Sequence, residues 1–320
     1  MTKRFSGSQL VVFARLTKFA QVGFGAAFAF GVAPWAIALH LSINPSLAGD
    51  PFRTEKPHEI GDRTQAAFEA IFQQGNYRAA EGYLKEALAK EPNEPLAYAM
   101  KASLAYGNKD WAKLSTYSQK TLESAQKLIP TDPLRGNLYT AVGHFLEGSV
   151  ILIREGTANG VPEAFGRLRQ VYKYLDKAEA ISANDPELNL IKGYMDLLLA
   201  VNLPFASPDQ AIGRLQENAA PQYLVHRGIA LAYRDLKRYP QALEYVNRAI
   251  ETAGDNPEIY YLKAQILRRQ GEKEKSQQLI KEAIANFDKA LTKKSQLPSN
   301  LVKQIESERK NAISLNNSAR

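Results

Sequence analysis

A spacing of 34 residues between similar stretches is the feature that most constrains the fold of this chain. Near the C-terminal end, five positions are followed 34 residues later by side chains of the same class: Ala230 and Ala264, Tyr233 and Leu267, Ala242 and Ser276, Val246 and Ile280, Ala249 and Ala283. Near the other end, Gly75-Asn76-Tyr77 precedes Lys109-Asp110-Trp111 at the same interval. A fixed period of this length is typical of repeat proteins, in which each unit buries its apolar face against its neighbours.

Within each period the pattern is typical of closely packed helices. A small side chain lets neighbouring helices approach closely, and a large apolar residue one turn away fills the remaining space. Proline or glycine ends each helix, because proline lacks an N–H group and glycine adopts φ angles that other residues avoid.

This series of small, aromatic, large apolar and proline positions resembles the tetratricopeptide-repeat family. The resemblance implies an all-α fold, a right-handed superhelical solenoid of about six helical hairpins over residues 61–288. With the family's first repeat position as the origin, six units start near Gly61, Pro95, Gly136, Pro186, Tyr223 and Pro257. The middle units are irregular, with interruptions at residues 155–161 and 202–208 that are either sequence drift or part of a working face. We expect residues 289–320 to form a capping helix, opened by Pro298, and a disordered tail of about ten residues.

Residues 1–48 predict an export signal. They contain four basic residues and no acid, and residues 22–41 contain no charged side chain at all. As a helix this apolar run would extend about 30 Å, the thickness of a membrane core. Small residues before Gly49 favour cleavage after Ala48. The alternative is an uncleaved N-terminal membrane anchor. Either way we expect the array outside the cytoplasm, in the periplasm or a lumen-like compartment, joined through an exposed linker at residues 49–60.

The charge and cysteine content exclude several classes of protein. Beyond Ala48, 37 basic side chains face 33 acidic ones, so the net charge of 37 − 33 = +4 is weak for nucleic-acid binding. The chain has no cysteine, which excludes disulfide frameworks, thiolate metal sites and cysteine nucleophiles. We expect no nucleic-acid partner, and contact with a membrane only through the N-terminal segment if it is uncleaved.

No catalytic motif stands out. The four histidines lack the spacing that would present two ligands to one metal ion, and no glycine-rich phosphate loop is present. We therefore predict a non-enzymatic chain with no catalytic residue, no cofactor and no metal. Two alternatives remain open. One is a cell-envelope hydrolase that uses a carboxylate in a helical groove, and the other is a structural protein that self-assembles through an acidic first unit and a basic last one.

The family resemblance also implies a binding groove lined by the first helix of each unit. In the fifth and sixth units, the residues carried over to this groove are Leu224, Arg227, Leu231, Arg234, Tyr261, Gln265, Arg268 and Arg269. Arginine forks bind carboxylates in pairs, so an acidic or C-terminal segment is the expected guest. We predict a scaffold that binds a peptide segment or helix of another exported or membrane protein and assists assembly of a membrane complex. The alternative is a solvated helix face.

Two further surface features are interpreted from spacing alone. Arg169, Lys173 and Lys177 lie four apart on one predicted helix, and we interpret them as exposed surface, with contact to anionic lipid as the alternative. Tyr77, Trp111 and Tyr239 recur at one repeat position, which favours a role in filling the core.

Overall fold

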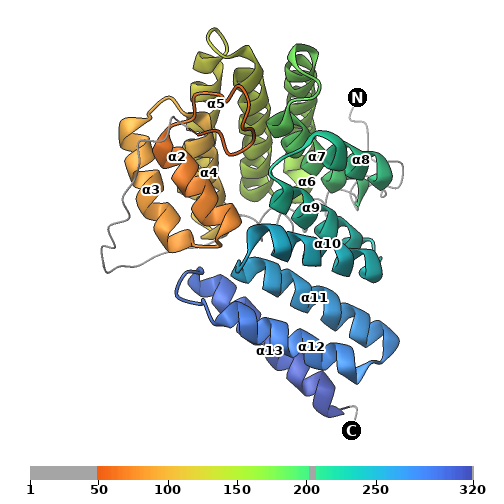
Figure 1. The fold of residues 1–320 in the computed structure, drawn as a ribbon. Helices are drawn as coiled ribbons and strands as arrows, with labels where there is room; N and C mark the ends of the chain where they lie inside the picture. The colour runs from red at the N-terminus through yellow and green to blue at the C-terminus, as the bar shows by residue number, and fades with distance from the viewer. Residues whose placement is uncertain (1–48, 202–206, 319–320) are drawn as a thin grey trace. The chain divides into compact units, whose positions relative to one another are not determined.

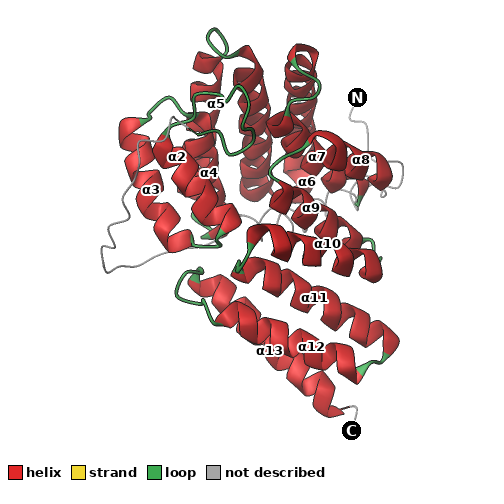
Figure 2. Cartoon of the chain, in the orientation of Figure 1, coloured by secondary structure: helices red, strands yellow, loops and turns green. Residues whose placement is uncertain are grey.

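The structure is a computed structural model that describes residues 49–201 and 207–318. Within these ranges the chain is helical and contains no strand, which confirms the all-α prediction (Figure 2). The expected leader, with its apolar run at residues 22–41, lies outside the described residues, as does most of the expected insertion at residues 202–208. None of the helices in the described ranges is both long enough and apolar enough to cross a membrane.

Successive helices follow one another through short turns (Figure 1). Their bounds are α2 Asp62–Phe68, the π-helical turn η2 Glu69–Gln73, α3 Tyr77–Lys90, α4 Pro95–Gly107, α5 Trp111–Leu128, α6 Pro133–Ile181, α7 Pro186–Ala200, α8 Pro208–Asn218, α9 Gln222–Asp235, α10 Tyr239–Ala253, α11 Pro257–Glu274, α12 Gln277–Leu291 and α13 Ser299–Ser318. The predicted unit starts lie at or close to the starts of α2, α4, α6, α7, α9 and α11.

Local sequence explains where several of these helices start. Five helices have proline as their first residue, where its missing N–H group costs nothing, and the residue before that proline caps a free backbone N–H. The capping residues are Glu94, Asp132, Asp185, Ser207 and Asn256. These helix boundaries are therefore fixed by short-range chemistry.

The described chain divides into two compact units, each with its own packing. Unit 1 comprises residues 88–219, and unit 2 comprises residues 49–87 together with 220–318. Inside both units most helices pack mainly on their neighbours in sequence, as in α4–α5, α5–α6 and α7–α8 of unit 1 and in α9 through α13 of unit 2. This is the contact pattern of stacked helical hairpins, so the repeat architecture predicted from the 34-residue period is present in both.

The α6 segment of unit 1 is a hairpin of two limbs rather than one rod. Gly156 has φ 73° and ψ 169°, a backbone conformation open essentially only to glycine, and the chain reverses there. The first limb, residues 133–155, and the second limb, residues 157–181, pack together through a buried cluster that includes Leu138, Val171 and Leu175. The expected interruption at residues 155–161 is thus a one-residue reversal within the third hairpin.

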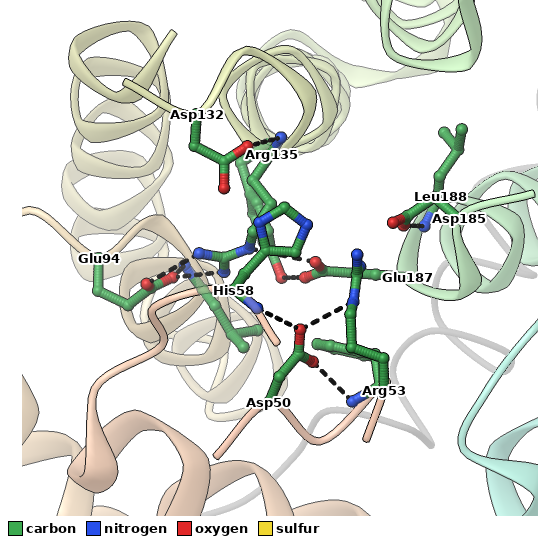
Figure 3. A network of polar contacts seen from close by, with 12 residues as sticks. Asp50, Arg53, His58, Glu94, Asp132, Arg135, Asp185, Glu187 and Leu188 are labelled. Carbon is green, nitrogen blue, oxygen red and sulfur yellow. Dashed lines mark hydrogen bonds and ion pairs between the residues drawn. The ribbon is translucent and has the colours of Figure 1, made fainter. Parts of the chain in front are cut away.

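A buried ion-pair cluster joins three first helices of unit 1. Arg135 of α6 is 1% exposed and donates to both carboxylate oxygens of Glu94, the cap of α4, at 2.8 and 3.1 Å. Its Nε donates to Glu187 of α7 at 3.1 Å, and Tyr139 donates its hydroxyl to the same carboxylate at 2.5 Å. Figure 3 shows the guanidinium group of Arg135 reaching both acids. One arginine therefore pairs with two buried carboxylates from neighbouring repeats.

Unit 2 brings together segments far apart in sequence. Asn256, which is fully buried, caps α11 by accepting from the N–H of Glu258 at 2.9 Å. Its side-chain N–H group donates to the carbonyl oxygens of Phe72 and Gln73, at 3.1 and 3.2 Å, where η2 ends. Tyr77 of α3 donates its hydroxyl to Glu258 at 2.6 Å. The first hairpin thus docks on the start of α11 in the same chain.

Three expectations differ from the structure. Residues 49–60, expected as an exposed linker, are partly folded, since Phe52 and Ile60 are buried. The ring of Phe52 packs edge-on against the ring of Phe68, with the ring centroids 4.9 Å apart. Trp111 does not fill the core but is 42% exposed, although Tyr77 is buried as predicted. The expected disorder at the C-terminal end is replaced by helix as far as Ser318, because α13 covers the last hairpin.

The reversal at Gly156 predicts that one added methyl group at this position destabilises the fold. We expect Gly156→Ala to lower the free energy of unfolding by about 1–3 kcal/mol, because alanine is strained at this φ and ψ. Gly166→Ala, in the regular second limb, is the matched control and should raise it by up to about 1 kcal/mol. Neither added Cβ would meet a heavy atom within 4 Å. Urea unfolding followed by circular dichroism measures both, and equal effects would contradict the prediction.

The buried cluster around Arg135 predicts that removal of this arginine destabilises the fold. Arg135→Ala leaves Glu94 and Glu187 buried without their counter-ion, and we expect a loss of about 3–5 kcal/mol in the free energy of unfolding. The control, Arg248→Ala, removes a solvent-exposed pair with Glu244 and should change stability by less than about 0.5 kcal/mol. Chemical denaturation measures both variants, and similar losses for the two would count against the cluster.

Candidate partner-binding surface

The eight residues predicted to line a groove all lie on α9 and α11 of unit 2. Leu224, Arg227, Leu231 and Arg234 come from α9, and Tyr261, Gln265, Arg268 and Arg269 come from α11. The structure brings them to neighbouring first helices, as the repeat register implies. Six of the eight are buried, and only Arg268 and Arg269 keep more of their side chains in solvent, at 20% and 34%.

Arg227 is held inside the protein by an acid from the next repeat. It donates to Glu258 of α11 at 2.9 Å, and Glu258 also accepts the hydroxyl of Tyr77. Burial raises the pKa of Glu258, while the positive charge of Arg227 and the hydrogen bond from Tyr77 act in the opposite direction. The same arrangement, one buried glutamate that accepts from an arginine and a tyrosine, occurs at Arg135, Glu187 and Tyr139 in unit 1. Arg227 therefore joins neighbouring repeats from inside the protein.

A second polar cluster runs from α9 through α11 to the capping helix α13. Arg234 pairs with Asp235 at 2.9 Å and donates to Gln265 at 2.8 Å. Gln265 donates in turn to Glu308 of α13 at 3.1 and 3.2 Å, and Tyr261 donates its hydroxyl to Glu308 at 2.6 Å. Glu308 is therefore the acceptor through which α13 is tied to α11 and, by way of Gln265, to α9.

The two more accessible arginines also have acidic neighbours. A guanidinium nitrogen of Arg268 lies 2.5 Å from a carboxylate oxygen of Glu272, and another lies 3.9 Å from one of Glu308. A guanidinium nitrogen of Arg269 lies 3.4 Å from a carboxylate oxygen of Asp235. The predicted surface is consequently a balanced set of charges rather than a purely basic one. Binding of a partner by these residues stays a prediction, and the geometry restricts direct contact mainly to Arg268 and Arg269.

Glu308 is the member of this cluster that lies on α13, and the groove prediction did not include it. Its position carries a signal, because Leu301, Ile305 and Ala312 mark the buried face of α13 and Glu308 falls on the same face, one helical turn after Ile305. A lone acid on an apolar helix face needs a partner when buried, and here the partners come from α11. The family register stops before α13 and therefore did not include it.

No metal-binding constellation is formed by the residues that the structure describes, since no three histidine or carboxylate side chains gather there with suitable geometry. His144 lies 3.4 Å from Glu147 and packs beside Tyr174, with ring centroids 5.6 Å apart. The ring of His226 packs against the ring of Tyr245, with the ring centroids 6.2 Å apart. The histidines of the helices thus have local packing partners.

The cluster around Glu308 predicts a pH dependence. Burial, and then the negative charge of Glu308, raise the pKa of Tyr261 above its ordinary value near 10. The unfolded chain loses this proton near pH 10 while the folded chain keeps it, so the stabilisation is present below pH 10 and is lost as pH rises further.

We therefore expect Tyr261→Phe to cost about 1.5–3 kcal/mol at pH 8, where a hydrogen bond to a charged acceptor is removed. The difference between wild type and variant should shrink above pH 10. Urea unfolding at pH 8, 10 and 11 measures it, and a difference that stays constant with pH would contradict the assignment of a buried, protonated Tyr261.

Comparison with known proteins identifies a protein family that this chain matches. The chain matches the family described as N-terminal acetyltransferase A, auxiliary subunit, over residues 62–290. Among solved structures it is similar to a chain from the "Crystal structure of APC/C hetero-tetramer Cut9-Hcn1", with 16% identity and a TM-score of 0.33. That match covers 78% of this chain and 48% of the other, so the chain spans about half the length of the structure it matches. No curated protein matches at a significant level.

The family match runs from the start of α2 to the end of α12 and so spans the helical repeats. A description as an auxiliary subunit agrees with the expectation of a non-catalytic chain. Because the match covers more than half of its residues, the chain belongs to the N-terminal acetyltransferase A auxiliary subunit family, whose model spans its tetratricopeptide-like helical array.

Proposed function

We propose that this protein is a non-catalytic scaffold whose helical array binds another protein. The observation that carries the proposal is the family match across residues 62–290, which coincides with the stacked hairpins. A repeat array offers a long preformed surface, so a partner is bound without a large ordering cost in the scaffold. The buried ion-pair clusters support this role because they fix neighbouring first helices relative to one another within each unit.

The proposed contact surface is the side of α11 that carries Arg268 and Arg269. Both guanidinium groups are partly in solvent, and each already lies near a carboxylate of the chain itself. A carboxylate-bearing segment of a partner would add to this network of charges or replace the exposed side chain of Glu272 in it. The six buried members of the predicted set, from Leu224 to Gln265, hold α9 and α11 in position rather than contact the guest.

Two kinds of partner follow from different observations. The family description names an auxiliary subunit of an N-terminal acetyltransferase, which points to an enzyme subunit as the guest. The basic and apolar segment 1–48 points instead to export, with another exported or membrane protein as the guest in the periplasm or a lumen-like compartment. We propose the second, because the leader is a feature of this chain itself, and the experiment below separates the two.

The test is in-cell crosslinking followed by purification of the full chain. We expect Arg268→Glu combined with Arg269→Glu to lose the main crosslinked partner while keeping the helical circular dichroism of the wild type. Arg227 and Arg234 are left unchanged, since replacing buried, ion-paired residues would unfold unit 2 and remove any partner without information. The mass of the purified chain also reports cleavage after Ala48.

The matched control is Arg248→Glu combined with Lys281→Glu, two exposed basic residues of α10 and α12 that bring the same change in charge. Loss of the partner in both double variants, or in neither, would argue against the α11 surface. An acetyltransferase subunit among the partners, with an uncleaved chain, would overturn the proposal of export and retain the scaffold.

A further inference from the structure

The two limbs of α6 and the end of α7 leave a recess between them in unit 1. Its volume is about 80 Å³, and it opens to solvent. The first limb contributes Phe145 and Leu152 to its walls, the second limb Leu168 and Val171, and α7 Leu199. All of these side chains except Val171 keep part of their surface in solvent. The described part of the chain therefore leaves an apolar recess open.

The recess is poorly suited to water and has the size of a small aliphatic group. A bound water needs about two to four polar partners, and among the described lining residues only His144, Ser149 and Arg167 have polar side chains. The hydroxyl of Ser149 already donates to the carbonyl oxygen of Phe145 at 3.2 Å. A cavity of about 150 Å³ accommodates benzene, so a recess of about 80 Å³ accommodates about three or four carbon atoms.

Arg167 gives the recess a positive charge. It is the only Lys, Arg, Asp or Glu among the described lining residues. Its Nη1 atom lies 2.8 Å from a carboxylate oxygen of Glu147, which is not part of the lining, and 3.5 Å from Nδ1 of His144. In the described part of the chain, its Nε and Nη2 atoms have no hydrogen-bond partner, and 35% of the side chain is in solvent. This side of the guanidinium group is open to a ligand.

The same chain shows that one guanidinium group can pair with two carboxylates. Arg135 donates from Nη1 and Nη2 to Glu94, and from Nε to Glu187. Arg167 has one carboxylate, that of Glu147, on Nη1, so Nε and Nη2 are left for a second. An anionic group next to a short aliphatic chain therefore matches both the charge and the size of the recess.

We propose that this recess binds a small monocarboxylate with a branched aliphatic chain of about three or four carbon atoms. The carboxylate pairs with Arg167, and the chain lies between the limbs of α6 and the end of α7. The chain displaces poorly bound water and adds apolar contacts to all three helical segments. Since these segments belong to two successive repeats, the bound acid links the third hairpin to α7. This site is separate from the α11 surface proposed for a partner protein.

The test is methyl NMR of the full chain with 3-methylbutanoate as the probe. We expect the methyl signals of Leu152, Leu168 and Leu199 to shift, with a Kd on the order of 1 mM for so small a ligand, while those of Leu262 and Ile280 in unit 2 stay unchanged. Acetate, which lacks most of the chain, should bind about 50-fold more weakly. The uncharged 3-methylbutan-1-ol should bind about tenfold more weakly.

Two variants separate the apolar and the charged part of the site. Ser149→Leu adds an aliphatic side chain to the lining and should abolish the shifts, whereas Ser115→Leu, at a partly exposed serine of α5 outside the recess, should not. Arg167→Gln should weaken binding about tenfold. Its control is Arg154→Gln, which removes an exposed arginine that also pairs with a glutamate but does not line the recess, and should leave the Kd unchanged.

The proposal is overturned if acetate binds as tightly as 3-methylbutanoate, if a folded Ser149→Leu variant still binds, or if no signal shifts well above the expected Kd. Should Ser149→Leu not fold, Arg167→Gln and the comparison of the three small ligands decide. Octanoate and N-acetyl-leucine test other guests. Tighter binding of octanoate would assign the recess to a long acyl chain, and tighter binding of N-acetyl-leucine to the last residue of a peptide, and either result would overturn the proposal.

Discussion

A buried arginine between the first helices of neighbouring repeats is the interaction on which this structure depends. Arg135 forms ion pairs with Glu94 and Glu187 in unit 1, and Arg227 forms one with Glu258 in unit 2. In both places a tyrosine hydroxyl completes the shell of the glutamate. Charges this far from water are tolerated only when each is paired and hydrogen-bonded, so the neighbouring helices are restricted to one relative position. Apolar packing alone would permit helices to slide more easily.

This use of arginine changes how the binding surface is understood. A groove register borrowed from a repeat family counts arginines as if each were available to a guest, yet Arg227 and Arg234 are already part of the protein's own framework. Charge available to a partner lies on side chains that stay partly in solvent, as Arg268 and Arg269 of α11 do. Scaffold and surface roles are therefore divided between different side chains, and α11 carries both kinds.

The helix starts could be predicted from sequence because their causes are local. A capping side chain followed by proline identifies the starts at Pro95, Pro186 and Pro257, and all three coincide with helix boundaries. The family register places the third unit near Gly136, and the proline that opens its helix, Pro133 after the cap Asp132, lies about one turn earlier.

The burial of side chains could not be predicted in the same way, because it depends on distant partners. Arg227 is buried by an acid 31 residues away. Tyr77 and Trp111 share one repeat position, but Tyr77 meets Glu258 in the interior, whereas Trp111 rests against Tyr106 and remains open to solvent. Glu308 lies beyond the last repeat altogether. A sequence period describes which residues are equivalent, and it does not describe the neighbours that each equivalent residue meets.

The docking of the first hairpin onto α11 has a consequence for the order of events during synthesis. Tyr77 and Glu258 are separated by 181 residues, and at about 5–20 residues per second the ribosome needs roughly 10–40 s to deliver the second after the first. Throughout that interval Phe72 and Tyr77, both buried in the finished protein, have not yet received the start of α11. The nascent chain therefore passes through a period in which the first hairpin lacks the segment that covers it in the finished protein.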